Sequence, residues 1–103
     1  MFKNKNNRYI TRGVNEEVDI RLQLLIWSMI DNLNEKGNIE VDYLQVFKLR
    51  KEGAFIVIEH YQEVPEYKKI YSLELEDIEL DNRLKIYVID SGEYATMLLP
   101  QEY

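Results

Sequence analysis

The chain has 103 residues, with 13 Lys and Arg against 19 Asp and Glu, so its formal net charge is −6 with the single His neutral. A chain of this length is expected to form one domain, residues 1–103, and 46% hydrophobic residues suffice for a core. The absence of Cys excludes disulfides, thiolate metal sites and Cys nucleophiles. No run approaches the roughly 20 apolar residues of a membrane span, and no apolar signal-peptide block is present. We therefore expect a cytoplasmic protein without membrane contact.

Residues 1–7 are expected to form a mobile basic arm. They contain Lys3 and Lys5 among three Asn, with no acidic residue. The segment has little apolar surface to pack, so order is predicted to begin near Tyr9. The charge is therefore uneven, with a basic arm on an acidic body.

The longest helical pattern runs from about Asp19 to Lys36. Apolar side chains recur there at steps of three and four, which places them on one face of a helix: Leu22, Ile26, Met29, Ile30 and Leu33. Gly37 suits the left-handed residue that ends a helix. Leu24, Leu25 and Trp27 widen the apolar arc, which predicts that the helix is covered on more than one side.

Short β-rich runs follow the helix, at residues 43–49, 55–61, 69–75, 84–89 and 94–99. Gly53 and Gly92 fall in loops where hairpins need a positive φ. Residues 55–58 are apolar on both faces, as in an inner strand, and residues 9–11 are a candidate edge strand. The pattern predicts an α+β fold, in which a mainly antiparallel twisted sheet of about five or six strands carries one long helix across one face.

Four segments of the chain resemble a family of small staphylococcal proteins of unknown function, which also occurs in other Firmicutes and their phages. They are Arg8 to Asn15, Asp42 to Phe47, Gln62 to Lys68 and Ser91 to Leu99. The resemblance implies an origin in the cytoplasm of a Gram-positive bacterium or its phage. It implies no activity and assigns no site residue.

The residues that could support catalysis are few. His60, the single imidazole, is expected to be a half-exposed strand residue, because its neighbours give no reason for it to act as a base. The glycines are too far apart to form a phosphate-binding loop. We therefore expect no catalytic residue, no metal site and no cofactor.

An acidic run contains five carboxylates in eight residues: Glu74, Glu76, Asp77, Glu79 and Asp81. It lacks the ligand spacing and the Gly of a calcium loop. Two interpretations remain, a solvated turn and a surface that faces a basic partner.

Tyrosine is the unusual feature of the composition, with eight residues. Tyr61, Tyr67 and Tyr71 flank a Pro-containing connection, and tyrosine is common at protein interfaces. The alternative is that these residues simply half-bury on the sheet. Together with the acidic run, they form the candidate interface.

The leading hypothesis is a small acidic non-enzymatic binding protein that acts through protein–protein contacts, with a basic protein as the expected kind of partner. Direct nucleic-acid binding is not expected, because only the arm and a patch at Lys48, Arg50 and Lys51 are basic.

Two alternative functions stay open. The first is an acidic phage-type inhibitor of a nucleic-acid enzyme, similar to anti-CRISPR proteins, whose carboxylates replace phosphates. The second is a metal-dependent enzyme that uses scattered carboxylates. The sequence leaves the oligomeric state open.

Overall fold

The computed structural model describes residues 1–80 and 83–103, which form one six-stranded sheet and two α-helices. In chain order the elements are β1 (Arg8–Ile10), α1 (Arg12–Glu17), α2 (Ile20–Lys36), β2 (Leu44–Glu52), β3 (Phe55–Gln62), β4 (Tyr67–Glu74), β5 (Leu84–Asp90), β6 (Ala95–Leu98) and the short 3-10 helix η1 (Pro100–Glu102).

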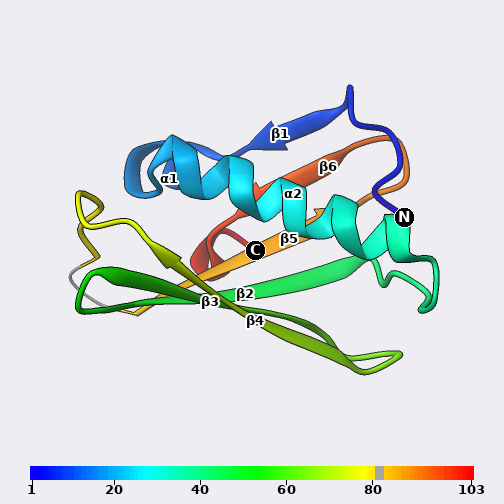
Figure 1. Cartoon of the computed structure of the whole chain (residues 1–103). Helices are drawn as coiled ribbons and strands as arrows, with labels where there is room; N and C mark the ends of the chain where they lie inside the picture. The colour runs from blue at the N-terminus through cyan, green and yellow to red at the C-terminus, as the bar shows by residue number, and fades with distance from the viewer. Residues whose placement is uncertain (81–82) are drawn as a thin grey trace.

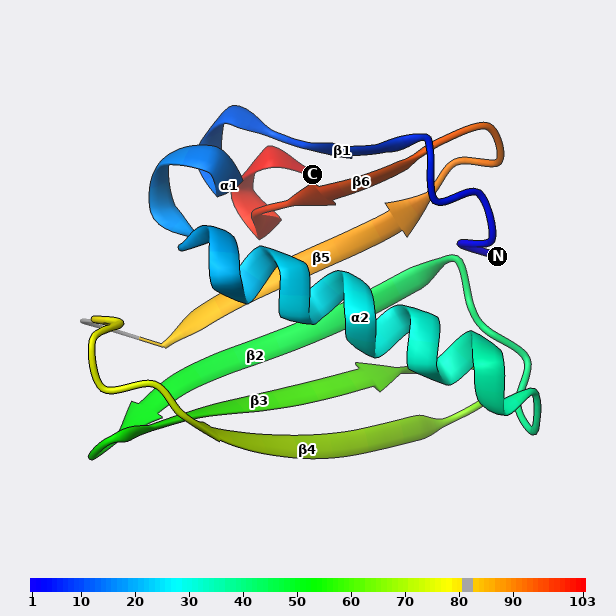
Figure 2. The same ribbon diagram turned by 45° about the horizontal axis from the view of Figure 1, so that its top comes forward.

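The strands lie in the order β1-β6-β5-β2-β3-β4, and α2 crosses one face of the sheet (Figure 1, Figure 2). The α+β class is confirmed. The sheet is mixed, because β1 pairs with β6 in parallel while the other four pairings are antiparallel. A parallel pairing requires a long connection, and here β1 and β6 lie at opposite ends of the chain. The long helix is preceded by the shorter α1, so the sequence prediction missed one helix.

The pattern of the long helix is confirmed, since all five residues of its predicted apolar face are buried. The Asp19 side chain accepts a hydrogen bond from the Arg21 N–H at 2.9 Å and caps the first turn, and Gly37 ends the helix with φ 65°. Leu24 is 61% exposed. Within residues 1–80 and 83–103, part of the outer face of α2 is therefore uncovered.

The register of the strands separates the two faces of the sheet. Phe47 of β2 lies beside Ile86 of β5 and His60 of β3, and all three are fully buried beneath α2. The next residues along these strands point to the opposite face, away from α2 (Figure 2). We call this the open face; it includes Lys48, which is exposed. At one place on that face the C-terminal Tyr103 packs edge-on against Tyr87 of β5, at 5.8 Å between ring centres.

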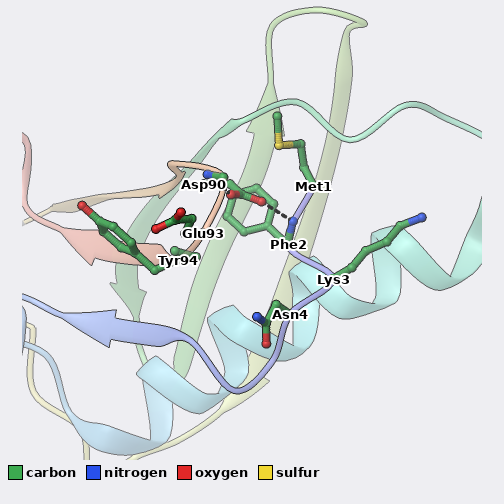
Figure 3. A pocket seen from close by; sticks show the side chains of 9 residues that line it. Met1, Phe2, Lys3, Asn4, Asp90, Glu93 and Tyr94 are labelled. Atoms are coloured by element: carbon green, nitrogen blue, oxygen red, sulfur yellow. Dashed lines mark hydrogen bonds between the residues drawn. The ribbon is translucent and has the colours of Figure 1, made fainter.

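The N-terminal segment contacts the core through one side chain. Phe2 is only 2% exposed, and its N–H donates to the Asp90 carboxylate at 2.5 Å (Figure 3). Arg8 then joins β1 to α2, because it pairs with Asp31 at 2.5 Å and lies 4.9 Å from the ring centre of Trp27. The composition of residues 1–7 did not point to the burial of Phe2.

Candidate functional site

Strand β4 forms a free edge of the sheet. It is eight residues long and pairs with β3 on one side, and among the described residues no element lies beyond it (Figure 2). The Leu75 N–H donates to the Ala54 carbonyl at 3.0 Å, so residues 54 and 75 form a hydrogen-bonded pair. Hydrogen-bonded pairs recur at every second residue of an antiparallel pairing, so the odd-numbered residues of β4 bond to β3. The even residues direct their backbone N–H and C=O groups outward: Lys68, Ile70, Ser72 and Glu74.

The three candidate tyrosines lie near this edge on different faces. Tyr67 and Tyr71 are half-buried on the helix-covered face of β4, and Tyr61 lies opposite Lys68 on the open face. Burial raises the pKa of both Tyr67 and Tyr71, so their hydroxyls stay protonated at neutral pH. Ile70, which is 56% exposed, lies between them on the opposite face of the strand. The free edge is thus flanked by apolar side chains on both faces.

The acidic run begins at Glu74, the last residue of β4, and its charges are not equivalent. Asp77 accepts from Arg21 at 2.8 Å, and this hydrogen bond lowers the pKa of Asp77. Glu79 lies 4.0 Å from the Lys51 ammonium. Glu74 and Glu76 are exposed, and their carboxylates have no cationic partner within the described part of the chain, although the Lys51 ammonium donates to the Glu76 carbonyl at 2.9 Å. Asp81 lies outside the described residues. The unpaired charge of this run is therefore concentrated at the end of β4.

His60 is fully buried, so the expectation of a half-exposed residue was wrong. Its ring stacks on Phe47 at 4.3 Å and meets Tyr67 edge-on at 5.6 Å. Its Nε2 donates to the Gln45 side-chain oxygen at 2.6 Å, and burial lowers the pKa of His60 to about 4. The imidazole is therefore neutral at pH 7 and sealed from solvent, which suits a structural role better than catalysis.

Gln62 extends this network to the start of β4. Its side-chain oxygen accepts from the Asp42 N–H and from Gln45, at 2.9 and 2.8 Å. Its amide donates to the carbonyls of Glu40 and Pro65 at 2.9 and 2.7 Å. All four bonds of a buried amide are satisfied, so the network holds the β3–β4 connection to the sheet. Nothing in the spacing of these residues pointed to it.

The open face carries a basic group that the sequence analysis found only in part. A hollow of about 270 Å³ is lined by Lys48, Arg50, Arg83 and Lys85, with Glu59 as the acidic residue. A second hollow, of about 510 Å³, shares Lys48 and Glu59 and extends to Tyr61, and it is also lined by Lys68 and by the acidic Glu63 and Glu66. The sequence does contain a signal for Arg83 and Lys85, because in residues 83–87 the apolar side chains alternate with charged and aromatic ones. Side chains two residues apart in a strand point to the same face, so Arg83 and Lys85 could have been assigned to the basic patch that contains Lys48.

Two further observations concern the described residues alone. No cluster of three or more His, Asp or Glu side chains is arranged there to hold a metal ion. No helix in residues 1–80 or 83–103 has the length and apolarity needed to cross a membrane.

The sequence pattern of a family described as "Staphylococcal protein of unknown function" matches residues 7–102. The chain belongs to this family. A crystal structure of a protein of unknown function from Enterococcus faecalis is similar, with a TM-score of 0.85 and 28% identity over 99% of this chain and 94% of that one. No curated protein matches. The family membership agrees with the resemblance seen in the sequence, and both the family and the similar crystal structure are described as being of unknown function.

Proposed function

We propose that this member of the staphylococcal family is a non-enzymatic binding protein of a Gram-positive cytoplasm or its phage, which contacts a protein partner through strand β4. The observation that carries the proposal is the eight-residue free edge. An extended segment of a partner can add a strand to such an edge, with main-chain hydrogen bonds giving affinity and side-chain contacts giving specificity.

The side chains around the edge support this mode. Tyr67 and Tyr71 would pack against an added strand on one face and Ile70 on the other. Glu74 and Glu76 add unpaired negative charge at one end of β4, which favours a partner with a basic stretch there. The buried His60 network fixes the other end, so that the edge is held in one conformation before binding.

The acidic-inhibitor alternative has less support. A mimic of phosphates needs free carboxylates, whereas Asp77 already pairs with Arg21 and Glu79 lies near Lys51. The metal-dependent enzyme would need carboxylates that converge on one point. In the described part of the run, Asp77 and Glu79 are exposed on either side of Ile78, whose side chain is buried in the core.

The test compares two substitutions of one residue. The N–H of Ile70 points away from β3, so Ile70→Pro keeps the ladder with β3 and blocks an added strand. Ile70→Ala is the matched control, because it removes the side chain and retains the N–H. A partner is first captured from a Gram-positive lysate, and the Kd of the purified partner is then measured for each variant.

We expect Ile70→Pro to weaken binding at least about ten-fold at an unchanged melting temperature, and Ile70→Ala to weaken it less. Equal affinity for the natural chain and Ile70→Pro would overturn the proposal. A dimer that Ile70→Pro converts to a monomer would also contradict it, since the occupant of the edge would then be a second copy of this chain.

The charge component is tested separately. Glu74→Gln with Glu76→Gln should flatten the ionic-strength dependence of binding while stability changes little, because exposed charges contribute little to the fold. Glu17→Gln with Glu35→Gln makes the same change of net charge on the helices and should leave the dependence as it was. Millimolar Ca²⁺ or Mg²⁺ should leave the melting temperature unchanged. If these ions raised it, and Glu74→Gln with Glu76→Gln abolished the rise, a metal site would be favoured instead.

A further inference from the structure

The open face presents tyrosines and cations in adjacent rows. The register places Tyr61 and Tyr87 on either side of Val46, in one row across β3, β2 and β5. The next row, two residues along the strands, places Lys48 beside Lys85. The two rows are about 6.8 Å apart, from the rise of about 3.4 Å per residue in an antiparallel strand. Each ring therefore lies next to an ammonium group.

The two lysines face each other at close range. The Asp90 N–H donates to the Tyr43 carbonyl at 2.9 Å, so residues 43 and 90 form a hydrogen-bonded pair. Such pairs recur at every second residue, so the odd-numbered residues of β2 bond to β5 and the even-numbered ones do not. Lys48 and Lys85 then form a non-hydrogen-bonded pair, in which Cα atoms are only about 4.5 Å apart. Like charges in this position destabilise a sheet. Glu59 is the neighbour of Lys48 on β3, and its pKa is lowered by the hydrogen bond from Lys68 and further by the charge of Lys48. Neither ammonium lies within ion-pair distance of a carboxylate in residues 1–80 and 83–103, so a bound anion would relieve the remaining repulsion.

The surrounding side chains add to the positive charge. Arg83 and Arg50 complete the lining of the 270 Å³ hollow, although the charge of Arg50 is partly offset because it pairs with Glu52. Its one carboxylate, Glu59, already accepts from Lys68 at 3.0 Å and lies 3.7 Å from Arg50, and the Lys68 bond lowers the pKa of Glu59. The hollow is thus cationic in a chain whose net charge is −6. The net negative charge of the chain therefore does not describe this face, and the basic patch is larger than the one at Lys48, Arg50 and Lys51 that the sequence indicated.

The rings distinguish between kinds of anion. The ammonium groups of Lys48 and Lys85 lie 5.4 Å from the ring centres of Tyr61 and Tyr87, respectively. Tyr87 also meets the ring of the C-terminal Tyr103 edge-on at 5.8 Å. A cation and an aromatic ring are therefore presented together at two neighbouring places. A single-stranded nucleic acid supplies a phosphate with a planar base at every step, which matches this pairing. An acidic peptide supplies the negative charge without the repeated rings.

We propose that the open face binds single-stranded nucleic acid, with phosphates held by the cations of the hollow and bases packed on Tyr61 and on the Tyr87–Tyr103 pair. This surface lies on the face of the sheet and does not depend on the free edge of β4. The two proposals therefore succeed or fail independently.

The test measures fluorescence anisotropy of labelled oligo(dT) and oligo(U) with the full chain, over a series of salt concentrations from about 50 mM. The key variant is Lys48→Gln with Lys85→Gln. Its matched control is Lys3→Gln with Lys36→Gln, which changes the net charge equally and leaves the open face intact. Thermal melting of each variant verifies the fold.

We expect the key variant to weaken binding at least about ten-fold and to reduce the slope of log K against log salt by about 1.4, which corresponds to two phosphate contacts. The control should stay within about two-fold. Tyr61→Leu should weaken binding about five-fold or more and leave the slope unchanged, because stacking is lost and no charge is removed.

Three results would overturn the proposal. The first is no binding of either oligonucleotide at about 50 mM salt. The second is equal binding by the key variant and the control, which would place the contact outside the hollow. The third is binding of polyglutamate or polyphosphate as tight as that of oligo(dT), with no effect of Tyr61→Leu, which would make the hollow a general polyanion site.

Discussion

Burial of His60 as a neutral ring makes the stability of this protein depend on pH in a window where few carboxylates titrate. The pKa of His60 is about 4 in the folded chain, against 6.5 for an ordinary imidazole. As pH falls below 6.5, the unfolded chain takes up a proton that the folded chain does not, so folding loses stability. Between pH 7 and pH 5 the loss is about 2 kcal/mol, from about 1.4 kcal/mol per pH unit.

The assay is urea unfolding followed by the fluorescence of Trp27 at pH 7, 6 and 5, for the natural chain and for His60→Gln. Glutamine does not titrate, so the variant should lack the 2 kcal/mol dependence whatever its stability at pH 7. The carboxylates whose pKa is lowered, such as Asp77 and Glu59, lose their contribution only at lower pH. Parallel pH profiles for the two proteins would refute the reasoning, because another group would then dominate this window.

Two packing predictions use the same unfolding assay. Ile26→Ala should cost about 2 to 5 kcal/mol, because a fully buried side chain leaves a cavity, and a cost below about 0.5 kcal/mol would place this residue on the surface. Phe2→Ala should cost about 3 kcal/mol and Lys3→Ala close to nothing, since Phe2 is buried and Lys3 is exposed. Deletion of residues 1–7 should therefore lower the melting temperature by several degrees, and an unchanged value would mean that Phe2 does not contribute to the core.

The helix and the strand runs were predictable because their information is local. The spacing of Leu22, Ile26 and Leu33 specifies a buried helical face, and Gly53 and Gly92 specify hairpin loops with φ 61° and 101°. The parallel pairing of β1 with β6 joins the two ends of the chain, so no local pattern could report it.

The site was less predictable than the fold. The sequence singled out Tyr67, Tyr71 and Glu74, which lie on the free edge, but it could not show that β4 is an edge strand. That property depends on the order of all six strands. The burial of His60 and its bond to Gln45 also depend on register between strands, which residue types alone do not fix.

The central claim, that β4 is a free edge which receives a partner strand, is tested most directly by residue-resolved amide hydrogen exchange. In the free protein the amides of Lys68, Ile70, Ser72 and Glu74 should exchange quickly, while those of Lys69, Tyr71 and Leu73 are protected by their bonds to β3. Addition of the partner should slow the first set and leave the second unchanged. Strong protection of Ile70 and Ser72 in the free monomer, or no slowing in the complex, would contradict the account.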